Sequence, residues 1–397
     1  MKRERHEHNN HIENEEENNN NDIISDLPDS VLLHILSFLK TKDAVKTCIL
    51  STRWKNLWKH LSILTLYSSH FKTLRDFFKF VSRILFLRDD STAIHTLDLH
   101  RRGIIEPHLL KKIIKYAVSH NVQQLEIDVG CDIQHFPTCL FSCQTLTSLH
   151  LYVRHRISGQ RTLFPNSLNL PSLTNLSLDS FAFPIENDGR ANPFSAMKRL
   201  NNLIIDDCIV LDAQKLCISS DRLTDLTIQT TFERCFCEIE LSTPSLCTFD
   251  FIGIPYQKLR GSHLSSIKQV NFDANIMENP TKPPSVLLSW LLELTGIKSL
   301  RVTSTTLQVL SLVPNLLKVE FPSLCNLKSL KVKRKEISYE LSKSLLDANF
   351  AKLPTGASYT DVVKLWETFS EGSSSIPDGI VDFLLQNSPS AEVDIIN

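Results

Sequence analysis

Residues 200–210 read LNNLIIDDCIV, and this stretch carries the pattern that decides the fold. Apolar side chains stand at the first, fourth, sixth and eleventh positions, and a cysteine occupies the ninth. In a β-strand alternate residues point to the same side, so Leu203 and Ile205 would be buried together on one face. The stretch therefore predicts a short strand that has one buried face.

The same spacing returns along the chain from Ala93 onward, at intervals of 21 to 30 residues. Leucine is abundant, with 59 of the 397 residues, so an isolated match means little, but ten matches at regular intervals indicate a repeat. The residues in the place of Leu203 are Leu97, Leu125, Leu149, Leu176, Leu203, Leu226, Phe249, Val270, Leu300 and Leu330.

Repeats of this length bury their apolar residues against their neighbours and are not stable alone. We therefore expect a stacked array of leucine-rich repeats. The polar or cysteine position that follows the strand is filled in the 200–210 unit but mostly missing elsewhere, which predicts an irregular array. Leu307, Leu310 and Leu312 also fit the spacing but follow Leu300 too closely, so we interpret them as a helix that ends near Pro314.

Composition excludes several classes of protein. The 43 basic and 44 acidic residues give a net charge of −1, which argues against a nucleic-acid binder. The 10 glycines form no phosphate-binding loop and no nucleophile elbow. No signal peptide and no apolar run of about 20 residues is found, so we expect no membrane span and a location in the cytoplasm, the nucleus or both.

The N-terminal region changes character at residue 22. Residues 1–21 are rich in Asn and Glu, which predicts a disordered tail. Residues 22–66 then predict three short helices, the first opened by Pro28 and the third by Ser51. Such a small unit buries little surface by itself, so it is marginally stable without a partner.

Two stretches of this region, LPDSVLLHILSFL at 27–39 and AVKTCILSTRWKNLW at 44–58, resemble an F-box. The Leu-Pro pair, the Ile-Leu-x-x-Leu stripe and the Leu-Ser-x-Arg-Trp turn fall at the spacing of that family. Together with the repeats, the chain resembles the plant-type F-box/leucine-rich-repeat proteins over roughly residues 22–335.

The resemblance and the repeats together define an α/β architecture, in which a small all-helical F-box module precedes an irregular leucine-rich-repeat solenoid, or horseshoe. The expected segments are a disordered tail (1–21), the F-box module (22–66), a connecting and capping helix (67–92), the repeat array (93–335) and a C-terminal cap (336–397).

The resemblance also implies a function. Such a chain is the substrate-recognition subunit of a Skp–cullin–F-box ubiquitin ligase: it binds a Skp-family adaptor, and through it a cullin, and holds a protein target without catalysing a reaction or needing a cofactor. The expected adaptor-binding residues are Leu27, Pro28, Val31, Ile35, Leu36, Val45, Leu50, Trp54 and Trp58. Three alternatives remain: an interaction scaffold without ubiquitination, a ligase receptor that also binds a small molecule, and a hydrolase, for which no motif speaks.

In a leucine-rich horseshoe, the residues that flank the buried strand positions line the concave face. Here many are acidic, and near the C-terminal end they become basic at Arg301, Lys331 and Lys333. We hypothesise that a basic segment of the target binds the acidic part, although such residues are often only solvated. The candidate target-binding residues are Asp128, Tyr152, Asp179, Asp206, Asp225 and Asp250.

Two sets of residues that contain histidine are candidates for a metal site, but the sequence favours neither. Cys131, His135, Cys139 and Cys143 are spaced by four residues, but Pro137 interrupts any helix that would align them, so we expect these cysteines to fill the core. The histidines of the tail, at positions 6, 8 and 11, would bind a metal only weakly. The sequence therefore predicts no metal site.

Trp54→Ala tests the F-box interpretation. If Trp54 anchors the adaptor, the variant should bind the adaptor at least ~30-fold more weakly, because a buried anchor residue typically contributes at least ~2 kcal/mol. If Trp54 lies inside the module, the variant should instead unfold it. Adaptor affinity and the thermal unfolding of the module separate the two outcomes, and a folded variant with unchanged affinity would contradict both.

Overall fold

A computed structural model describes residues 24, 27–154, 161–165, 168–185, 189–211, 215–231, 236–276, 282–320, 324–351, 353, 358–369 and 375–396. The chain divides into two compact units, residues 1–61 and 62–397. The first is helical and the second is rich in strands, so the predicted mixed α/β class is confirmed. The tail predicted at 1–21, with its three histidines, lies outside the described residues.

The first unit consists of short helices. Its elements are α1 (Asp29–Ser37), α2 (Thr41–Lys46), the 3-10 turn η1 (Thr47–Ile49), α3 (Trp54–Leu57) and the 3-10 turn η2 (Trp58–His60). Pro28 precedes α1, where its fixed φ of −58° and missing N–H cost nothing. Four of these five elements are shorter than two helical turns, so their stability comes from packing rather than from helix propensity.

Packing in this unit brings the two ends of the F-box-like sequence together. Leu32 and Leu36, one turn apart on α1, are fully buried, and so is Ala44 on α2. The guanidinium of Arg53 donates to the Asp29 carboxylate at 3.0 and 2.8 Å and to the carbonyl oxygen of Leu27. Both nitrogens share Oδ1 of Asp29, and this charge-assisted contact joins the start of α1 to the start of α3.

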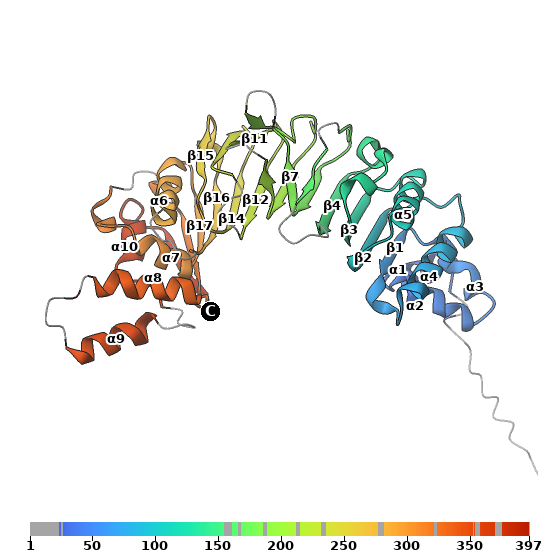
Figure 1. The fold of residues 1–397 in the computed structure, drawn as a ribbon, viewed down its shortest axis with the longest axis horizontal. Helices are drawn as coiled ribbons and strands as arrows, with labels where there is room; N and C mark the ends of the chain where they lie inside the picture. Colours follow the sequence, from blue (N-terminus) through green and yellow to red (C-terminus); the bar gives the residue numbers. More distant parts are fainter. Residues whose placement is uncertain are drawn as a thin grey trace, which may run out of the picture. The chain divides into compact units, whose positions relative to one another are not determined.

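The second unit is built on one parallel sheet (Figure 1). In spatial order its twelve strands are β1 (Ile63–Tyr67), β2 (Thr96–Ile104), β3 (Gln124–Gly130), β4 (Ser148–Arg154), β6 (Asn175–Asp179), β9 (Asn202–Asp206), β12 (Asp225–Thr230), β14 (Thr248–Gly253), β16 (Gln269–Ala274), β17 (Ser299–Thr303), β18 (Ser329–Lys333) and β19 (Glu392–Ile396). Each strand pairs with the next in this order, so the chain adds strands along one direction.

The strand register confirms the apolar spacing that occurs ten times in the sequence. The residues in the place of Leu203 are direct partners across neighbouring strands, from Leu97 on β2 to Leu330 on β18. All ten are buried. A second buried row lies two residues further along each strand, and the residues between the two rows point to the other face. Each buried leucine contributes about 1.5–3 kcal/mol.

Two smaller parallel sheets and several helices complete the second unit. One small sheet consists of β5 (Thr162–Leu163), β7 (Phe181–Phe183) and β10 (Ile209–Val210). The other consists of β8 (Arg190–Ala191), β11 (Lys215–Ser219), β13 (Glu238–Ser242) and β15 (Lys258–Gly261). The helices are α4 (Leu74–Leu87), α5 (Pro107–Ser119), α6 (Pro283–Glu293), α7 (Ser304–Ser311), α8 (Tyr339–Phe350), α9 (Tyr359–Phe369) and α10 (Ile380–Leu385). The longest of the 3-10 turns is η5 (Thr138–Ser142).

The core at the C-terminal half is aromatic. Trp290 on α6 is fully buried against Phe249, Phe251 and Phe272, with ring centroids 4.7 to 6.0 Å apart. Its indole Nε1 donates to the carbonyl oxygen of Gln257 at 2.8 Å, so burial leaves no donor unsatisfied. Helix α7 follows β17 directly, as the sequence predicted for Leu307 and Leu310.

Three features differ from the sequence prediction or were missed by it. Strand β1 belongs to the large sheet although its residues precede the first recognised repeat. Helix α4 forms within the 67–92 segment, where the sequence predicts a helix with Phe71, Leu74, Phe78, Val81 and Leu85 on its buried face. Val81 and Leu85 are buried as predicted, but Phe77 and Ile84 are buried as well, and Leu74 is exposed. In the C-terminal cap, the sequence predicts a helix at 381–385 and a final strand at 393–395, which correspond to α10 and β19, whereas it does not predict α8 and α9. Among the described helices, none is long and apolar enough to cross a membrane.

Candidate binding surfaces

The helical unit exposes a set of large apolar side chains. Ile49, Phe38 and Leu50 are the most exposed, at 84%, 77% and 64% of their surface. Val31, Ile35 and Leu39 are each 39% exposed. So many exposed large apolar side chains on so small a unit make this set a candidate for contact with a partner. We call these six residues the apolar set of the helical unit.

The large sheet presents a polar face formed by the residues between its two buried rows and beyond them. In one row Asp128, Tyr152, Asp179 and Asp206 are direct partners on β3, β4, β6 and β9. All four are half-buried. Asp225 and Asp250 lie on the same face in two other rows of the sheet, on β12 and β14. We call this the acidic face.

Carboxylates on this face are poorly solvated. Burial, with the neighbouring Asp179 and Asp207 charges adding to it, raises the pKa of Asp206 to about 7. Burial likewise raises the pKa of Asp179, against a hydrogen bond from Ser180 that lowers it. For Asp250, burial raises the pKa while the Asn271 amide, which donates to this carboxylate, lowers it. The ionised form of these groups is therefore less favourable than in water, and a nearby cation would stabilise it.

The C-terminal end of the same face carries basic side chains. Arg301 and Lys331 are direct partners on β17 and β18, and Lys333 lies two residues beyond. Lys335 forms an ion pair with Asp273 at 2.6 Å, and Lys331 lies 3.9 Å from Asp394 on β19. The acidic-to-basic order expected from the sequence is therefore present, with part of the basic end already neutralised by carboxylates.

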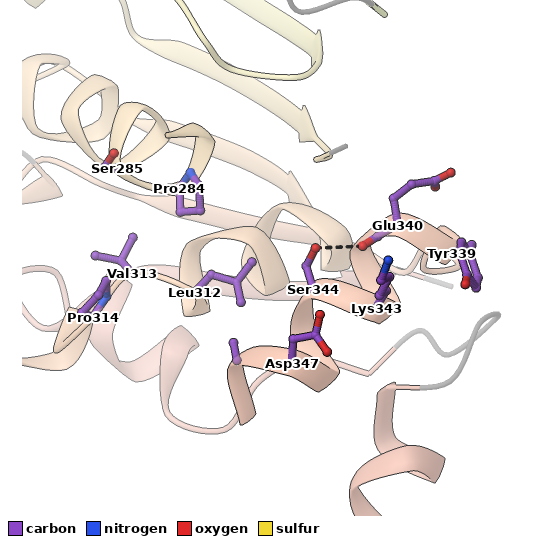
Figure 2. Close-up of a pocket in the computed structure, with 11 residues that line it drawn as sticks. Pro284, Ser285, Leu312, Val313, Pro314, Tyr339, Glu340, Lys343, Ser344 and Asp347 are labelled. Carbon is purple, nitrogen blue, oxygen red and sulfur yellow. Dashed lines mark hydrogen bonds between the residues drawn. The ribbon is translucent and has the colours of Figure 1, made fainter. Parts of the chain in front are cut away.

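A pocket of about 470 Å³ lies among α6, α7 and α8. Figure 2 shows Pro284 of α6, Leu312 and Val313 at the end of α7, and Lys343 and Asp347 of α8 around it. The Ser344 hydroxyl, also in the lining, donates to the Glu340 carbonyl oxygen at 2.9 Å. None of the target-binding residues expected from the sequence lines this pocket.

Comparison with known proteins identifies the first unit. The family model of the F-box domain matches residues 24–66. Residues 24–66 match an F-box, and the term F-box is used below for this stretch. The match covers the helical set from α1 to η2 and all of β1 except Tyr67.

Relatives from Arabidopsis thaliana extend the similarity beyond the F-box. An F-box/LRR-repeat protein is 26% identical over 73% of this chain and 64% of its own length. An F-box/FBD/LRR-repeat protein is 27% identical over 73% of this chain and 67% of its own length. An FBD-associated F-box protein is 33% identical, over 42% of this chain and 36% of its own length. The resemblance to plant F-box/leucine-rich-repeat proteins is therefore confirmed, and the matches span 64%, 67% and 36% of the length of these three relatives.

The nine expected adaptor-binding residues of the F-box fall into two groups. Pro28, Val31, Ile35 and Leu50 are exposed, and Leu27 and Val45 are half-buried. The others, Leu36, Trp54 and Trp58, are buried, and so they shape the module from inside. Of the two readings of Trp54→Ala given above, burial at 5% exposure favours loss of folding.

Sequence reasoning passed over Phe38, Leu39 and Ile49 as site residues, although Phe38 and Ile49 are the most exposed apolar residues of the F-box. Phe38 follows the last residue of α1, and Ile49 ends η1. A helical stripe selects residues that repeat along one face, so it overlooks side chains at helix ends. Two large apolar residues beside helix ends would have been the signal to look for.

The set Cys131, His135, Cys139 and Cys143 does not form a described group of converging metal ligands. Cys131 and Cys143 are buried, and burial raises the pKa of the Cys131 thiol to about 12, which keeps it protonated. The only described group of His, Cys and carboxylate residues whose ligand atoms converge is Asp98, His100 and Glu126 on the sheet.

Asp206→Asn should reduce the pH dependence of stability. The pKa of Asp206 is about 7 in the fold and about 4 in the unfolded chain, so between these values the folded protein binds more protons. Stability from this group is therefore lost as pH rises from ~4 to ~7. The variant should lose less stability over that range, measured as the thermal unfolding midpoint.

The exposed Asp221→Asn variant is the matched control and should follow the wild-type pH profile. If Asp206→Asn also keeps the wild-type profile, the carboxylate of Asp206 is not desolvated as described.

Proposed function

We propose that this chain is the substrate-recognition subunit of a Skp–cullin–F-box ubiquitin ligase. The F-box would bind a Skp-family adaptor, and through it a cullin, while the strand-rich unit would hold the protein target. The observation that carries the proposal is the F-box match at 24–66, on a unit that exposes large apolar side chains.

The physical case for a partner on the F-box rests on its size and surface. A unit of this length buries too little surface to be very stable alone. Covering Phe38, Ile49 and Leu50, which are largely exposed, would contribute about 1.5–3 kcal/mol each in the best case. The internal residues Trp54 and Trp58 would keep these side chains in place. A helix-lined apolar groove on the adaptor fits this surface.

Replacing the exposed residues tests the adaptor assignment. The double variant Ile49→Asp/Leu50→Asp places two charges in the interface, so we expect at least ~30-fold weaker adaptor binding, the equivalent of ~2 kcal/mol. Both side chains are exposed, so the F-box should remain folded. The measurement is co-expression with a Skp-family adaptor and purification on a tag carried by this chain.

The matched control is Phe86→Asp, which changes an equally exposed apolar residue on α4 of the other unit. Wild type and control should bring down stoichiometric adaptor, and the double variant should not. Adaptor retained by a folded double variant, or missing from folded wild type, would remove the basis for the ligase role. The better proposal would then be an interaction scaffold, although no observation specifically favours it.

We propose further that the strand-rich unit is an irregular leucine-rich-repeat solenoid that binds the target on its acidic face. Support comes from the in-register buried rows and from relatives whose names include LRR-repeat. Desolvated carboxylates favour a cationic partner, so the target segment would be rich in Lys or Arg. The chain would perform no chemistry itself: it would convert a bimolecular encounter into an intramolecular one. The cytoplasm, the nucleus or both are its proposed location.

Reversing three charges tests the target surface. In the triple variant Asp206→Lys, Asp225→Lys and Asp250→Lys, a basic segment should be repelled, so capture of target should be lost while adaptor binding stays intact. The measurement is the set of proteins that co-purify with wild-type chain and adaptor from plant cells treated with a proteasome inhibitor. Each protein captured by wild type is then compared in the variant.

The control makes the same charge change at Asp221, Glu320 and Asp378, which are exposed. It should capture the wild-type set. Targets that bind the triple variant as well as the wild type would contradict docking on the acidic face.

A further inference from the structure

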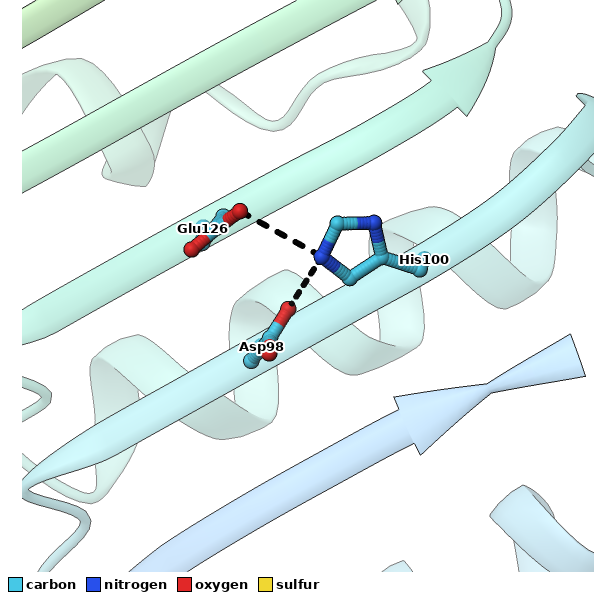
Figure 3. Close-up of side chains that lie close together, drawn as sticks. All are labelled: Asp98, His100 and Glu126. Atoms are coloured by element: carbon cyan, nitrogen blue, oxygen red, sulfur yellow. Dashed lines mark ion pairs between the residues drawn. The ribbon is translucent and has the colours of Figure 1, made fainter.

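Asp98, His100 and Glu126 form a compact group at the N-terminal end of the large sheet. Asp98 and His100 are two residues apart on β2, and Glu126 on β3 is the direct partner of Asp98. Alternate residues of a strand and direct partners on the next strand share a face, so all three side chains stand together. Figure 3 shows the imidazole of His100 beside the two carboxylates.

The distances between the ligand atoms of this group are close to those that a metal ion requires. Nε2 of His100 lies 2.9 Å from Oδ1 of Asp98 and 3.3 Å from Oε1 of Glu126. All three atoms lie within 4.8 Å of one another. Ligands about 2.0–2.1 Å from a tetrahedral Zn²⁺ are about 3.3 Å apart, so small shifts of the two carboxylates would close the site.

The other nitrogen of His100 is already oriented. Nδ1 lies 3.3 Å from Oδ2 of Asp128, and the Arg154 guanidinium donates to the Asp128 carboxylate at 3.0 Å. A carboxylate that accepts from one imidazole nitrogen directs the lone pair of the other nitrogen outward, as in carboxylate–histidine–zinc arrangements. Here that direction leads to Asp98 and Glu126.

Asp98 is held with one oxygen free. Its Oδ2 accepts a hydrogen bond from the hydroxyl of Tyr67. Its Oδ1 is buried and receives no hydrogen bond from the residues that the structure describes, although Nε2 of His100 is near. A buried carboxylate oxygen without a donor is costly, and a cation would satisfy it.

We propose that Asp98, His100 and Glu126 bind Zn²⁺, with Asp128 as the residue that positions His100. One imidazole and two carboxylates are a ligand set for Zn²⁺, whereas Mg²⁺ and Ca²⁺ prefer oxygen ligands alone. Three protein ligands leave the fourth position to water or to a side chain of a bound protein. His100 and Glu126 are 34% and 42% exposed, so that position is open to solvent.

Zinc binding by the full chain tests the proposal. Chelator-treated protein is titrated with Zn²⁺ by calorimetry, and with Co²⁺, whose visible absorption reports tetrahedral coordination. The chain also carries histidines at positions 6, 8 and 11, so every variant is made in a background with these three changed to alanine. We expect one Zn²⁺ per chain, a tetrahedral Co²⁺ spectrum and much weaker binding of Mg²⁺ and Ca²⁺.

Two variants remove ligands from the site. His100→Ala and Glu126→Gln should each weaken Zn²⁺ binding at least 10-fold and abolish the tetrahedral spectrum. Glu126→Gln is nearly isosteric at a partly exposed position, so it keeps the test valid if His100→Ala fails to fold. His108→Ala is the matched control, because this exposed histidine lies on α5 and pairs only with Glu106.

The positioning role of Asp128 has a separate readout. Asp128→Asn should lower Zn²⁺ affinity about 10–100-fold but retain one ion per chain and a tetrahedral Co²⁺ spectrum. The proposed site would be overturned if His100→Ala or Glu126→Gln bound Zn²⁺ as tightly as the chain that carries only the three tail changes. It would also be overturned if that chain bound no stoichiometric Zn²⁺. These measurements do not involve the adaptor, so their outcome tests the zinc site independently of the ligase proposal.

Discussion

The strand-rich unit depends on one constraint, the in-register pairing of parallel strands that each carry two buried apolar residues. Because each strand pairs with the next strand of the large sheet, Leu203 packs between Leu176 and Leu226, and the same holds at nearly every position of the row. A shift of one residue would turn the buried side chains to the polar face and the carboxylates into the core. The register therefore fixes both the core and the binding surface.

The sequence predicted this part of the fold well because the constraint leaves a periodic trace. Ten strands of the large sheet, from β2 to β18, were found through their apolar spacing, and the predicted row was confirmed residue by residue. The strands of the two small sheets were not predicted. Strand β1 was missed because all of it except Tyr67 lies within the stretch assigned to the F-box. The predicted buried face of α4 differs from the observed one, because Phe77 and Phe78 are adjacent and composition cannot decide which of them faces the core.

The binding surfaces were less predictable, for a physical reason. Periodicity identifies residues that repeat, whereas a site depends on residues that converge from different elements. The sequence placed Asp128 and Asp206 on one face correctly, but it did not include His100, whose significance depends on its distance to Glu126 across the strand pair. Likewise Trp54 stands in a recognisable motif, yet only the packing of the helices places it inside the F-box.

The acidic face supplies the physical argument for the proposed cationic partner. Burial raises the pKa of Asp179, Asp206 and Asp250, so ionising each of these carboxylates costs more than it would in water. Arg154 already offsets this cost at Asp128, and Lys335 does so at Asp273. Asp206 has only carboxylates, Asp179 and Asp207, among the charges that shift its pKa. The proposed metal ion at Asp98, His100 and Glu126 and the proposed basic segment beside Asp206 would each add positive charge to this face.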